Sequence, residues 1–322
     1  MITLGIESTA HTFGIGIIKD KSILANEKST YTTKKEGIIP AKAADHHIEV
    51  CDKILEKALK KAKIKKQDID LIAFSQSPGL GHTLRVGAMF ARTLSTTLNK
   101  PLIGVNHCIA HLEIGRLLTK AKDPILLYAS GANTQVIAYE ANKYRIFGET
   151  LDIGVGNFLD SFARYIGIGF PGGPKIEQLA KKSKNYIELP YVVKGMDVSF
   201  GGILTNLKNQ KAKKEDLCFS AQETVFAMLV EITERALAHT GKTEVLLGGG
   251  VACNKRLQEM ITLMCKERKA KSYVPENQYL VDNGAMIAWL GALMYNAGIT
   301  TRIEASQIEP YIRTDDIDVK WR

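Results

Sequence analysis

The chain has few cysteines, and their arrangement argues against two classes of protein. There are five cysteines in 322 residues, an odd number, and no two of them are spaced as CxxC. A disulfide framework uses cysteines in pairs, and thiolate zinc sites usually contain CxxC pairs. We therefore expect neither disulfides nor a cysteine-ligated zinc ion, and we expect a reducing, cytoplasmic location.

Long apolar runs are also missing. No stretch approaches the roughly 20 apolar residues that a membrane-spanning helix needs. The first residues, MITLGIESTA, have neither the basic n-region nor the long apolar h-region of a secretory signal. We expect no membrane association and no secretion.

Two common nucleotide-binding signatures give no support to a standard nucleotide fold. The P-loop pattern GxxxxGK[ST] does not occur. GxGxxG occurs as GIGFPG at residues 167–172, where it follows a helical pattern and contains a proline before its third glycine. The dinucleotide-binding version must follow a strand and open a helix, so we interpret this occurrence as a chance match.

What the chain does have is an ordinary globular composition with an excess of positive charge. It is 45% hydrophobic and 24% charged, with a formal net charge of +9. An excess of this kind favours a polyanionic partner. The densest basic run is KILEKALKKAKIKKQ at residues 53–67. Such runs more often form the wet face of an amphipathic helix, and nucleic-acid contact is the alternative.

One pattern of strands and helices occurs twice, which indicates a duplicated α/β architecture. Each copy opens with three strands, continues with a helix, and ends with alternating strands and helices. The first copy contains ITLGIES, FGIGIIK, SILANEKS, a helix over about 43–62, DLIAFS, a helix over about 85–98, PLIGV, and a helix from Asn106. The second contains PILLYAS, TQVIAYE, YRIFGET, a helix over about 219–239, EVLLGGG, another helix, KSYVP, and a final helix beginning near Asp282.

The repeat also predicts the domains. We expect an N-terminal lobe over 1–123, completed by residues 300–322, and a C-terminal lobe over 124–299 with an insertion at about 151–215. Ligands of α/β proteins usually lie at the carboxyl ends of strands, so a cleft between the lobes is the expected binding place. The loops after each first strand, ESTAHT and SGANT, can hold phosphate oxygens with backbone N–H groups and hydroxyls. In the first predicted helix, Ile48, Cys51, Leu55 and Leu59 form the apolar stripe.

Two histidines offer a metal site. His107 and His111, in NHCIAH, are four residues apart, so both rings lie on one face of a helix. This spacing alone leaves a cap and a packed imidazole as an equal alternative. A zinc peptidase would need HExxH, with a glutamate to activate water, and Cys108 stands in that position.

The repeat adds further ligands to this pair. If the two copies are pseudosymmetric, Asp282 faces the histidines across the cleft, and two imidazoles with a carboxylate suit iron or zinc. The strand end LLYAS could bring Tyr128 to the same place, although a packed ring with a hydrated hydroxyl is the usual alternative.

Several stretches together carry a resemblance to a known family. They are GIESTAHTFGIGI, PGLGHTLRVG, VNHCIAHLE, YASGANTQV, ETLDIGVGNFLDSFAR, PGGPKIE, LLGGGVACNKRL, VDNGAMIAW and the final DVKWR. The chain resembles the tRNA threonylcarbamoyl transferases, in the archaeal and eukaryotic branch that supplies the catalytic subunit of the KEOPS complex. That family was formerly labelled O-sialoglycoprotein endopeptidase. The matching stretches run along essentially the whole chain.

The resemblance implies an actin/Hsp70/sugar-kinase-like fold with two duplicated RNase H-like lobes around a central cleft. It implies a metal-dependent acyltransferase that moves threonylcarbamoyl from threonylcarbamoyl-AMP to the adenosine beside the anticodon, releasing AMP. One iron or zinc ion per subunit, a small atypical protein kinase and accessory KEOPS subunits are implied as well. Carried onto this sequence, the metal ligands are His107, His111, Tyr128 and Asp282. The adenylate-binding positions are Tyr128, Ala129, Ser130, Gly131, Ala132, Asp160, Gly173, Glu177 and Asn254.

Each carried position also has a plain structural alternative. Asp160 and Glu177 could form caps or surface ion pairs, Gly173 could only form a turn, and Asn254 could cap a helix. In the first turn, Ser8 and Thr9 are candidates for the phosphate side, and Ser8 stands where close archaeal relatives are expected to have glycine. Glu7 is the candidate for the proton of the attacking amine, with support of that turn as its alternative.

The tRNA is expected along lysines of the basic run and of KNQKAKK at 208–214. Rival functions are a metallopeptidase, an ATPase or sugar kinase of the same fold, and a non-catalytic scaffold. The first lacks its glutamate, the second gains nothing from the histidine pair, and the third would tolerate loss of His107.

Overall fold

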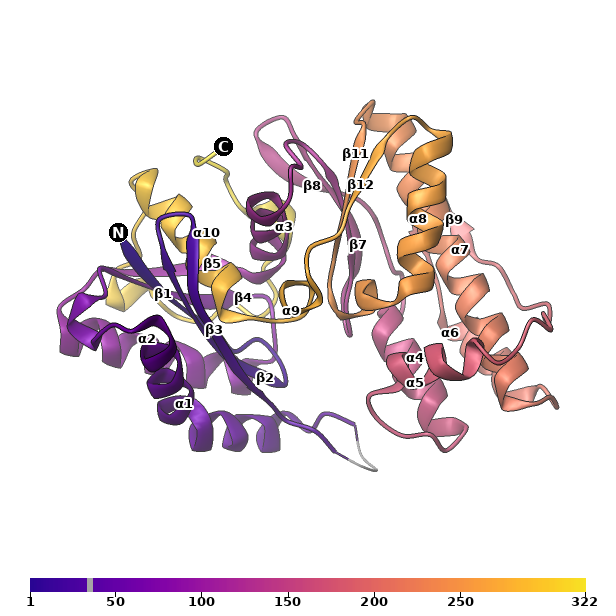
Figure 1. Ribbon diagram of the computed structural model, residues 1–322, viewed down its shortest axis with the longest axis horizontal. Coiled ribbons are helices and arrows are strands. Elements are labelled where there is room, and N and C mark those ends of the chain that lie inside the picture. Colours follow the sequence, from indigo (N-terminus) through magenta and orange to yellow (C-terminus); the bar gives the residue numbers. More distant parts are fainter. Residues whose placement is uncertain (34–36) are drawn as a thin grey trace. The chain divides into compact units, whose positions relative to one another are not determined.

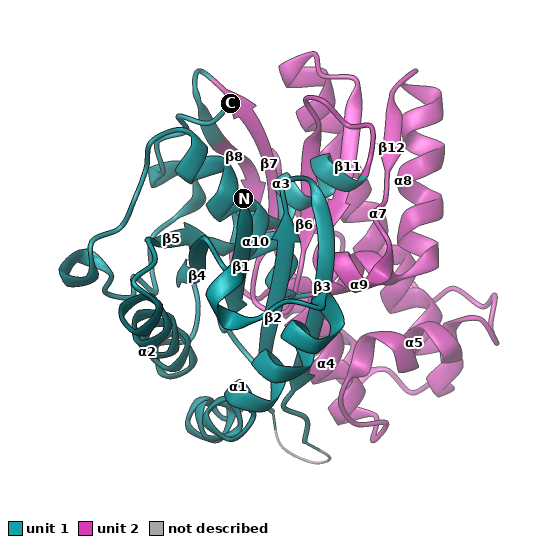
Figure 2. Ribbon diagram, turned by 60° about the vertical axis from the view of Figure 1, so that its left-hand side comes forward, with its two compact units in different colours: residues 1–118, 141–144, 282–322 teal, residues 119–140, 145–281 magenta. Residues whose placement is uncertain are grey.

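The computed structural model describes residues 1–33 and 37–322. Figure 1 shows the order of the elements along the chain. The chain divides into two compact units: unit 1 contains 1–118, 141–144 and 282–322, and unit 2 contains 119–140 and 145–281 (Figure 2).

Unit 1 is built on a five-stranded mixed sheet with the order β3-β2-β1-β4-β5. Its strands are β1 (Ile2–Glu7), β2 (Thr12–Lys19), β3 (Ser22–Thr30), β4 (Leu71–Ser77) and β5 (Leu102–Asn106). The first three pair antiparallel, and β1–β4 and β4–β5 are parallel. The carboxyl ends of β1, β4 and β5 therefore point the same way, as the repeat predicted.

Helices cover both faces of this sheet. On one face, α1 (Pro40–Ala62) and α2 (Gly81–Leu98) pack on Leu4 and Ile6. On the other face, where the alternation of β1 places Gly5, lies α10 (Gly284–Asn296). The remaining helical elements of this unit are α3 (His107–Leu118), η1 (Lys66–Asp68), η3 (Ile303–Ala305) and η4 (Thr314–Asp316).

The contact of α10 with the sheet is made by glycines. A Cβ on Gly5 or Gly16 would overlap backbone atoms of Ala288 or Ala285, and a Cβ on Gly284 would overlap the backbone of Gly16. Helix and strands thus approach with no side chain between them, which only glycine permits. The first turn of α10 lies directly on β2 as a result.

The apolar stripe predicted for the first helix differs from the structure at one position. Ile48 is 62% exposed, and His47 beside it is fully buried. Leu55 and Leu59 are buried as predicted, and Cys51 is partly buried. His47 packs edge-on against Phe13 of β2, with 5.5 Å between ring centroids. An imidazole therefore occupies the core position that hydrophobicity alone assigned to isoleucine.

Unit 2 contains a second five-stranded sheet with the order β12-β11-β6-β7-β8. Its strands are β6 (Ile125–Ala129), β7 (Thr134–Glu140), β8 (Lys143–Glu149), β11 (Glu244–Gly248) and β12 (Lys271–Tyr273), and the first two residues of β8 belong to unit 1. β6–β7 is antiparallel, and β6–β11 and β11–β12 are parallel. Read from β8, the strand order repeats that of unit 1, which confirms the predicted duplication.

The helices of unit 2 are α7 (Lys214–Thr240), α8 (Lys255–Glu267), η2 (Gly250–Cys253), α9 (Asn277–Leu280) and those of the insertion. The insertion comprises α4 (Val155–Tyr165), α5 (Gly172–Ala180), α6 (Gly201–Asn209) and the hairpin of β9 (Val193–Lys194) with β10 (Asp197–Val198). Val225, Met228, Leu229, Ile232 and Ala236 are fully buried, as predicted for the long helix.

The division differs from the predicted one in the place of the last helix. The prediction assigned residues 282–299 to the C-terminal lobe, whereas α10 belongs to unit 1 together with the C-terminal segment. The physical reason is the glycine contact, which gives α10 its packing partner on β1 and β2. Two helices also begin earlier than predicted, α2 at Gly81 and α7 at Lys214.

Among the described residues, no helix combines the length and the apolar character that crossing a membrane requires.

Candidate metal centre and strand-end loops

The two histidines lie at the start of α3, directly after β5. The side chain of Asn106 accepts hydrogen bonds from the backbone N–H groups of Cys108 (3.0 Å) and Ile109 (3.1 Å), so it caps the helix. This cap fixes where the helix begins and places both rings on one face, with their centroids 4.8 Å apart. Both histidines are buried.

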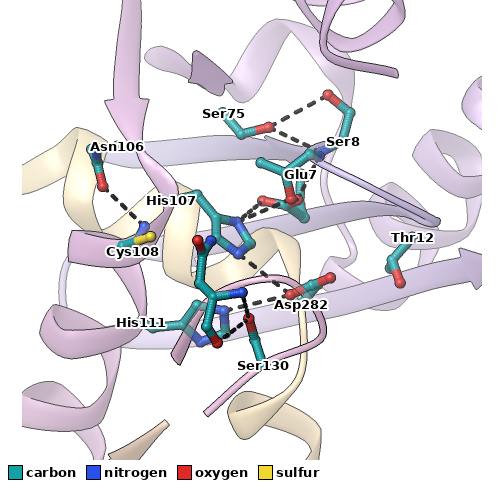
Figure 3. A network of polar contacts seen from close by, with 12 residues as sticks. Glu7, Ser8, Thr12, Ser75, Asn106, His107, Cys108, His111, Ser130 and Asp282 are labelled. Carbon is teal, nitrogen blue, oxygen red and sulfur yellow. Dashed lines mark hydrogen bonds and ion pairs between the residues drawn. The ribbon is translucent and has the colours of Figure 1, made fainter. Parts of the chain in front are cut away.

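Asp282 completes a three-residue cluster within unit 1 (Figure 3). Its Oδ1 lies 3.4 Å from His107 Nε2 and 3.5 Å from His111 Nε2. One ligand atom from each residue lies within 4.8 Å of the others. The prediction placed Asp282 in the opposite lobe through pseudosymmetry. The structure instead assigns it to the same unit as the histidines, because α10 packs on the first sheet.

Electrostatics favour the protonation states that a metal ion needs. Burial lowers the pKa of the His111 imidazole, with partial opposition from the Asp282 carboxylate. Burial alone would raise the pKa of Asp282, but hydrogen bonds and charges from His107 and His111 outweigh it and hold that pKa well below its usual value. A neutral imidazole beside a charged carboxylate is a donor set that suits divalent iron or zinc. The residues therefore fit such an ion.

Glu7, at the end of β1, orients His107. Its fully buried carboxylate lies 2.9 Å from His107 Nδ1 through Oε2. Oε1 accepts hydrogen bonds from the Thr9 backbone N–H (2.7 Å) and from the Thr9 hydroxyl. A carboxylate can only accept, so a neutral His107 donates its proton from Nδ1 and keeps the lone pair on Nε2, the nitrogen nearest Asp282.

Ser8 points away from this cluster. Its backbone N–H donates to the Ser75 hydroxyl (2.9 Å), and the two hydroxyl oxygens are 3.4 Å apart. Ser8 is fully buried, and a Cβ added at Gly87 of α2 would overlap its Oγ. Ser8 thus fixes the turn after β1 against α2, while Thr9 faces Glu7 and His107.

Cys108 is buried behind the histidines, and burial raises the pKa of its thiol. A protonated, buried thiol cannot replace the water-activating glutamate of HExxH. The residue between the histidines therefore gives no support to a peptidase mechanism.

In unit 2, the loop after β6 supports the start of α4. Backbone carbonyls of Ser130 and Gly131 accept from the N–H groups of Gly156 (3.0 Å) and Asn157 (2.9 Å). Thr134 Oγ1 accepts from the Val155 N–H (2.8 Å). Gly131 and Ala132 remain exposed at the tip, whereas Tyr128 and Ala129 are buried in β6. The exposed part of this turn is thus confined to Gly131 and Ala132.

The other predicted adenylate positions all lie in unit 2, on α4, α5 and the start of α8. Asp160 accepts from the Gly172 N–H (2.6 Å) and so holds the start of α5. Glu177 pairs with Lys181 (2.8 Å). Asn254 caps α8 through the Arg256 N–H (2.8 Å) and donates to Gln222 (2.9 Å). The structural alternatives are therefore realised for these three residues, and ligand contact would be an additional role.

Gly172 and Gly173 differ in a way that the sequence could not show. A Cβ on Gly172 would lie 2.6 Å from the Ala163 Cβ, so this glycine permits the approach of α5 to α4. A Cβ on Gly173 would have its nearest neighbour, in Leu159, at 3.9 Å. Gly173 therefore has open space around it, as a position facing a ligand needs.

One buried cluster next to the metal centre was missed in the sequence. The Glu113 carboxylate, in α3, accepts from the Tyr144 hydroxyl, from Arg116 (2.7 Å) and from the Trp321 indole (3.4 Å). Glu113 is 1% exposed, so these bonds satisfy a buried charge. The helix with both histidines is thereby held to the C-terminal segment. The final DVKWR was the available signal, but nothing in it identifies Glu113 as the partner.

The fold places the chain in the actin/Hsp70/sugar-kinase-like class. It matches the crystal structure of HypF from Thermococcus kodakarensis with a TM-score of 0.67 and 16% identity, over 92% of this chain and 48% of that one. It matches the 2-hydroxyisocaproyl-CoA dehydratase activator from Clostridium difficile, solved with bound ADPNP, with a TM-score of 0.57 and 14% identity, over 94% and 99% of the two chains. At these identities the likeness shows the fold alone.

The sequence comparisons define the family. The model of the tRNA N6-adenosine threonylcarbamoyltransferase family matches residues 22–289. Along its full length the chain is 56% identical to the tRNA N6-adenosine threonylcarbamoyltransferase of Thermococcus kodakarensis, whose whole length is covered. The chain therefore belongs to the tRNA N6-adenosine threonylcarbamoyltransferase family. It is also 55% identical to a probable bifunctional tRNA threonylcarbamoyladenosine biosynthesis protein of Methanocaldococcus jannaschii, of which it spans 60%.

Proposed function

We propose that this chain transfers threonylcarbamoyl from threonylcarbamoyl-AMP to N6 of the adenosine beside the tRNA anticodon. The observation that carries the proposal is the full-length family match together with the His107, His111 and Asp282 cluster. In the reaction, N6 attacks the carbamoyl carbon, a C–N bond forms, the C–O bond to phosphate breaks, AMP leaves, and N6 loses a proton. The amine is a weak nucleophile, so the rate acceleration must come from positioning of the reactants and stabilisation of the developing charge.

His107, His111 and Asp282 would hold one divalent ion, iron or zinc, with Tyr128 as a proposed fourth ligand. When bound, such an ion supplies positive charge that stabilises an anionic oxygen of the donor. Glu7 keeps His107 in the tautomer that exposes Nε2. Because both carboxylate oxygens of Glu7 are engaged, its bonds favour this orienting role over transfer of the amine proton.

The turns of unit 2 would hold the adenylate. The exposed backbone of Gly131 and Ala132 suits phosphate oxygens, since it lies at the tip of the turn after β6, and the half-buried Ser130 would contribute beside it. Asp160 and Glu177 are carboxylates suited to ribose hydroxyls, and open space at Gly173 leaves room for the sugar. Asn254 would contribute beside its capping role. In unit 1, Thr9 is the better candidate for the phosphate side than Ser8, which is engaged with Ser75.

Two lysine-rich surfaces would bind tRNA, one at the end of α1 and one at residues 208–214. The family resemblance further implies a separate small atypical kinase and accessory KEOPS subunits as partners, acting in the cytoplasm. The name of the M. jannaschii relative, which is longer than this chain, describes two functions in one polypeptide. The proposed partner kinase, as a separate polypeptide beside this chain, is compatible with that name.

The central test combines threonylcarbamoyl-AMP, unmodified tRNA, a divalent metal and the protein with its partners. Modified adenosine is measured by mass spectrometry of digested tRNA. We expect His111→Ala to abolish modification and to lower bound metal, while His239→Ala, an exposed histidine of unit 2, leaves both unchanged. Absence of modified adenosine with the unaltered chain, or full activity in His111→Ala, would refute the proposal.

A second test concerns the tRNA surface on α1. Lys60, Lys61, Lys63 and Lys65 are exposed, and Lys61 pairs with Glu27 at 2.7 Å. Replacing all four by glutamine should lower the dependence of log affinity on log salt by about 0.7 to 0.9 for each lysine that contacts phosphate. An unchanged slope would remove this run from the tRNA-binding surface.

A further inference from the structure

An aromatic side chain contacts the first lysine of the second lysine-rich surface, residues 208–214. Tyr165, the last residue of α4, is 52% exposed. Its hydroxyl donates to the backbone carbonyl of Lys208 in the last turn of α6 (2.6 Å). The Lys208 ammonium lies over the same ring, 5.7 Å from its centroid. One hydrogen bond and one cation–π contact thus hold the ring in a fixed orientation at the surface.

The segments that contain this ring and its partner Lys208 include an open position and several exposed lysines. Gly167, two residues beyond it, has φ +76°, and no atom lies within 4 Å of the place where its Cβ would be. Lys208, Lys211, Lys213 and Lys214 are all exposed, and none forms an ion pair with an acid in the described part of the chain. The acids that follow them are Glu215 and Asp216, and Asp216 is bonded to Ser183 and Asn185.

This surface differs from the basic run on α1 and from other exposed tyrosines. On α1 the lysines alternate with acids such as Glu56, and no large exposed aromatic of the described residues lies on that helix. Tyr191 of unit 2 is exposed to a similar degree, 49%, but its hydroxyl donates to Glu231 (2.6 Å). At Tyr165, in contrast, the exposed ring contacts a lysine that belongs to a cationic segment.

A ring beside a cation matches the two parts of a nucleotide. Single-stranded nucleic acid is bound by stacking bases on aromatic rings and by pairing phosphates with cations. Tyr165 is five residues beyond Asp160 on α4, which is about 7.5 Å along a helix. Five residues also turn a helix by about 140°, so the two side chains leave α4 on different faces.

We propose that Tyr165 stacks on an unpaired base of the tRNA anticodon loop, while Lys208 binds the adjoining phosphate. This inference rests on the proposed function and adds a substrate contact to it. The stacked base supplies affinity that salt does not screen, whereas the lysines supply affinity that salt does screen. The two contributions can therefore be measured separately.

The test measures binding of an anticodon stem-loop RNA to the full chain by fluorescence anisotropy at several salt concentrations. We expect Tyr165→Ala to weaken binding about 5- to 100-fold with an unchanged salt slope. Tyr165→Phe, which keeps the ring, should stay within about threefold of the unaltered chain. Lys208→Gln should lower the salt slope by about 0.7, the value for one phosphate contact on a single strand.

Tyr191→Ala is the matched control, because it removes an equally exposed tyrosine of the same unit. A 2-aminopurine placed in the loop gives a direct report of stacking: its fluorescence should be quenched by the unaltered chain and by Tyr165→Phe, and not by Tyr165→Ala. Equal losses in Tyr165→Ala and Tyr191→Ala, unchanged binding in Tyr165→Ala, or no measurable RNA binding at low salt would overturn the proposal.

Failure of this inference is distinguishable from failure of the proposed function. If the unaltered chain modifies tRNA and Tyr165→Ala does so with the same kcat/KM and affinity, only the stacking contact is wrong. If Tyr165→Ala loses RNA affinity but neither it nor the unaltered chain transfers threonylcarbamoyl, the stacking contact is supported and the proposed reaction is refuted.

Discussion

The two units have the same strand order but different chemistry at their strand ends. In unit 1, β1 ends in Glu7, α3 begins with His107 directly after β5, and Asp282 precedes α10, so side chains form the candidate site. In unit 2, β6 ends in the turn 128–132, whose exposed groups are largely backbone. Six of the seven histidines also lie in unit 1, and the exception is His239. The proposed roles follow this difference: a cation at the side chains of unit 1 and an anion at the turn of unit 2.

The largest expected effect that separates the units, after loss of His111 itself, concerns acid stability. Burial, followed by the charges of His46 and His11, lowers the pKa of His47 to about 4. The unfolded chain binds a proton near 6.5, so folding stability should fall as pH drops from about 6.5 to about 4, by roughly 3 kcal/mol in total. Above pH 6.5 His47 is neutral in both the folded and the unfolded chain, so it no longer lowers the folding stability.

Denaturant unfolding between pH 4 and 8 measures this effect. His47→Leu should flatten the acid limb of the stability profile, whereas His239→Gln in unit 2 should leave it unchanged. If the slopes of His47→Leu and the unaltered chain coincide, His47 is not the group that limits stability in acid.

A smaller effect is expected at Glu7. Glu7→Gln keeps the volume but removes the carboxylate that holds His107 Nδ1. Loss of such an outer partner typically costs about 10- to 100-fold in metal affinity. Titration with zinc and a competing chelator measures it, and AMP affinity in unit 2 should not change. Undiminished metal affinity would leave proton transfer as the better role for Glu7.

The smallest of these effects is expected at Asp160. This substitution lies in unit 2, so it should change AMP affinity and leave metal affinity unchanged. Asp160→Ala removes both a proposed ribose acceptor and the cap on the Gly172 N–H. Asp160→Asn retains a capping oxygen, so a comparison of the two separates binding from stability. We expect AMP affinity to fall about 10-fold in both, as for a hydrogen bond to a charged group. Calorimetry with AMP measures this, and a change in metal affinity would contradict the separation between units.

Local patterns were sufficient to predict most elements of the fold. The period of the apolar residues identified both sheets and the long helix at 214–240, because each buried stripe is a property of neighbouring residues. The histidine pair could be found for the same reason, since four residues of helix place both rings on one face. The prediction of Asp282 as a partner of the histidines depended on the repeat. Its place in unit 1 depends on the packing of α10 against the first sheet, which the repeat does not reveal.

Other features could not be predicted because they depend on distant partners. Hydrophobicity prefers Ile48 to His47 for the core, but α1 packs on the sheet with His47 against Phe13 of β2, so the imidazole is buried instead. Glu113 is 208 positions from Trp321 in the chain, and no spacing rule links them. The roles of Gly172 and Gly173 differ only through the neighbours that α4 provides.

The glycines between α10 and the first sheet have a consequence for how the metal site tolerates mutation. Because no side chains lie between the helix and the strands, the backbone of β1 and β2 directly fixes the position of the start of α10. If the helix rotated by one residue, a Cβ would overlap the sheet backbone. The position of Asp282, just before the helix, is therefore fixed. Gly5→Ala, Gly16→Ala or Gly284→Ala should therefore displace Asp282, because each added Cβ would overlap backbone atoms across this contact. An engineer who wished to retune the ion could vary the residues around Asp282 and keep these three glycines as the fixed frame.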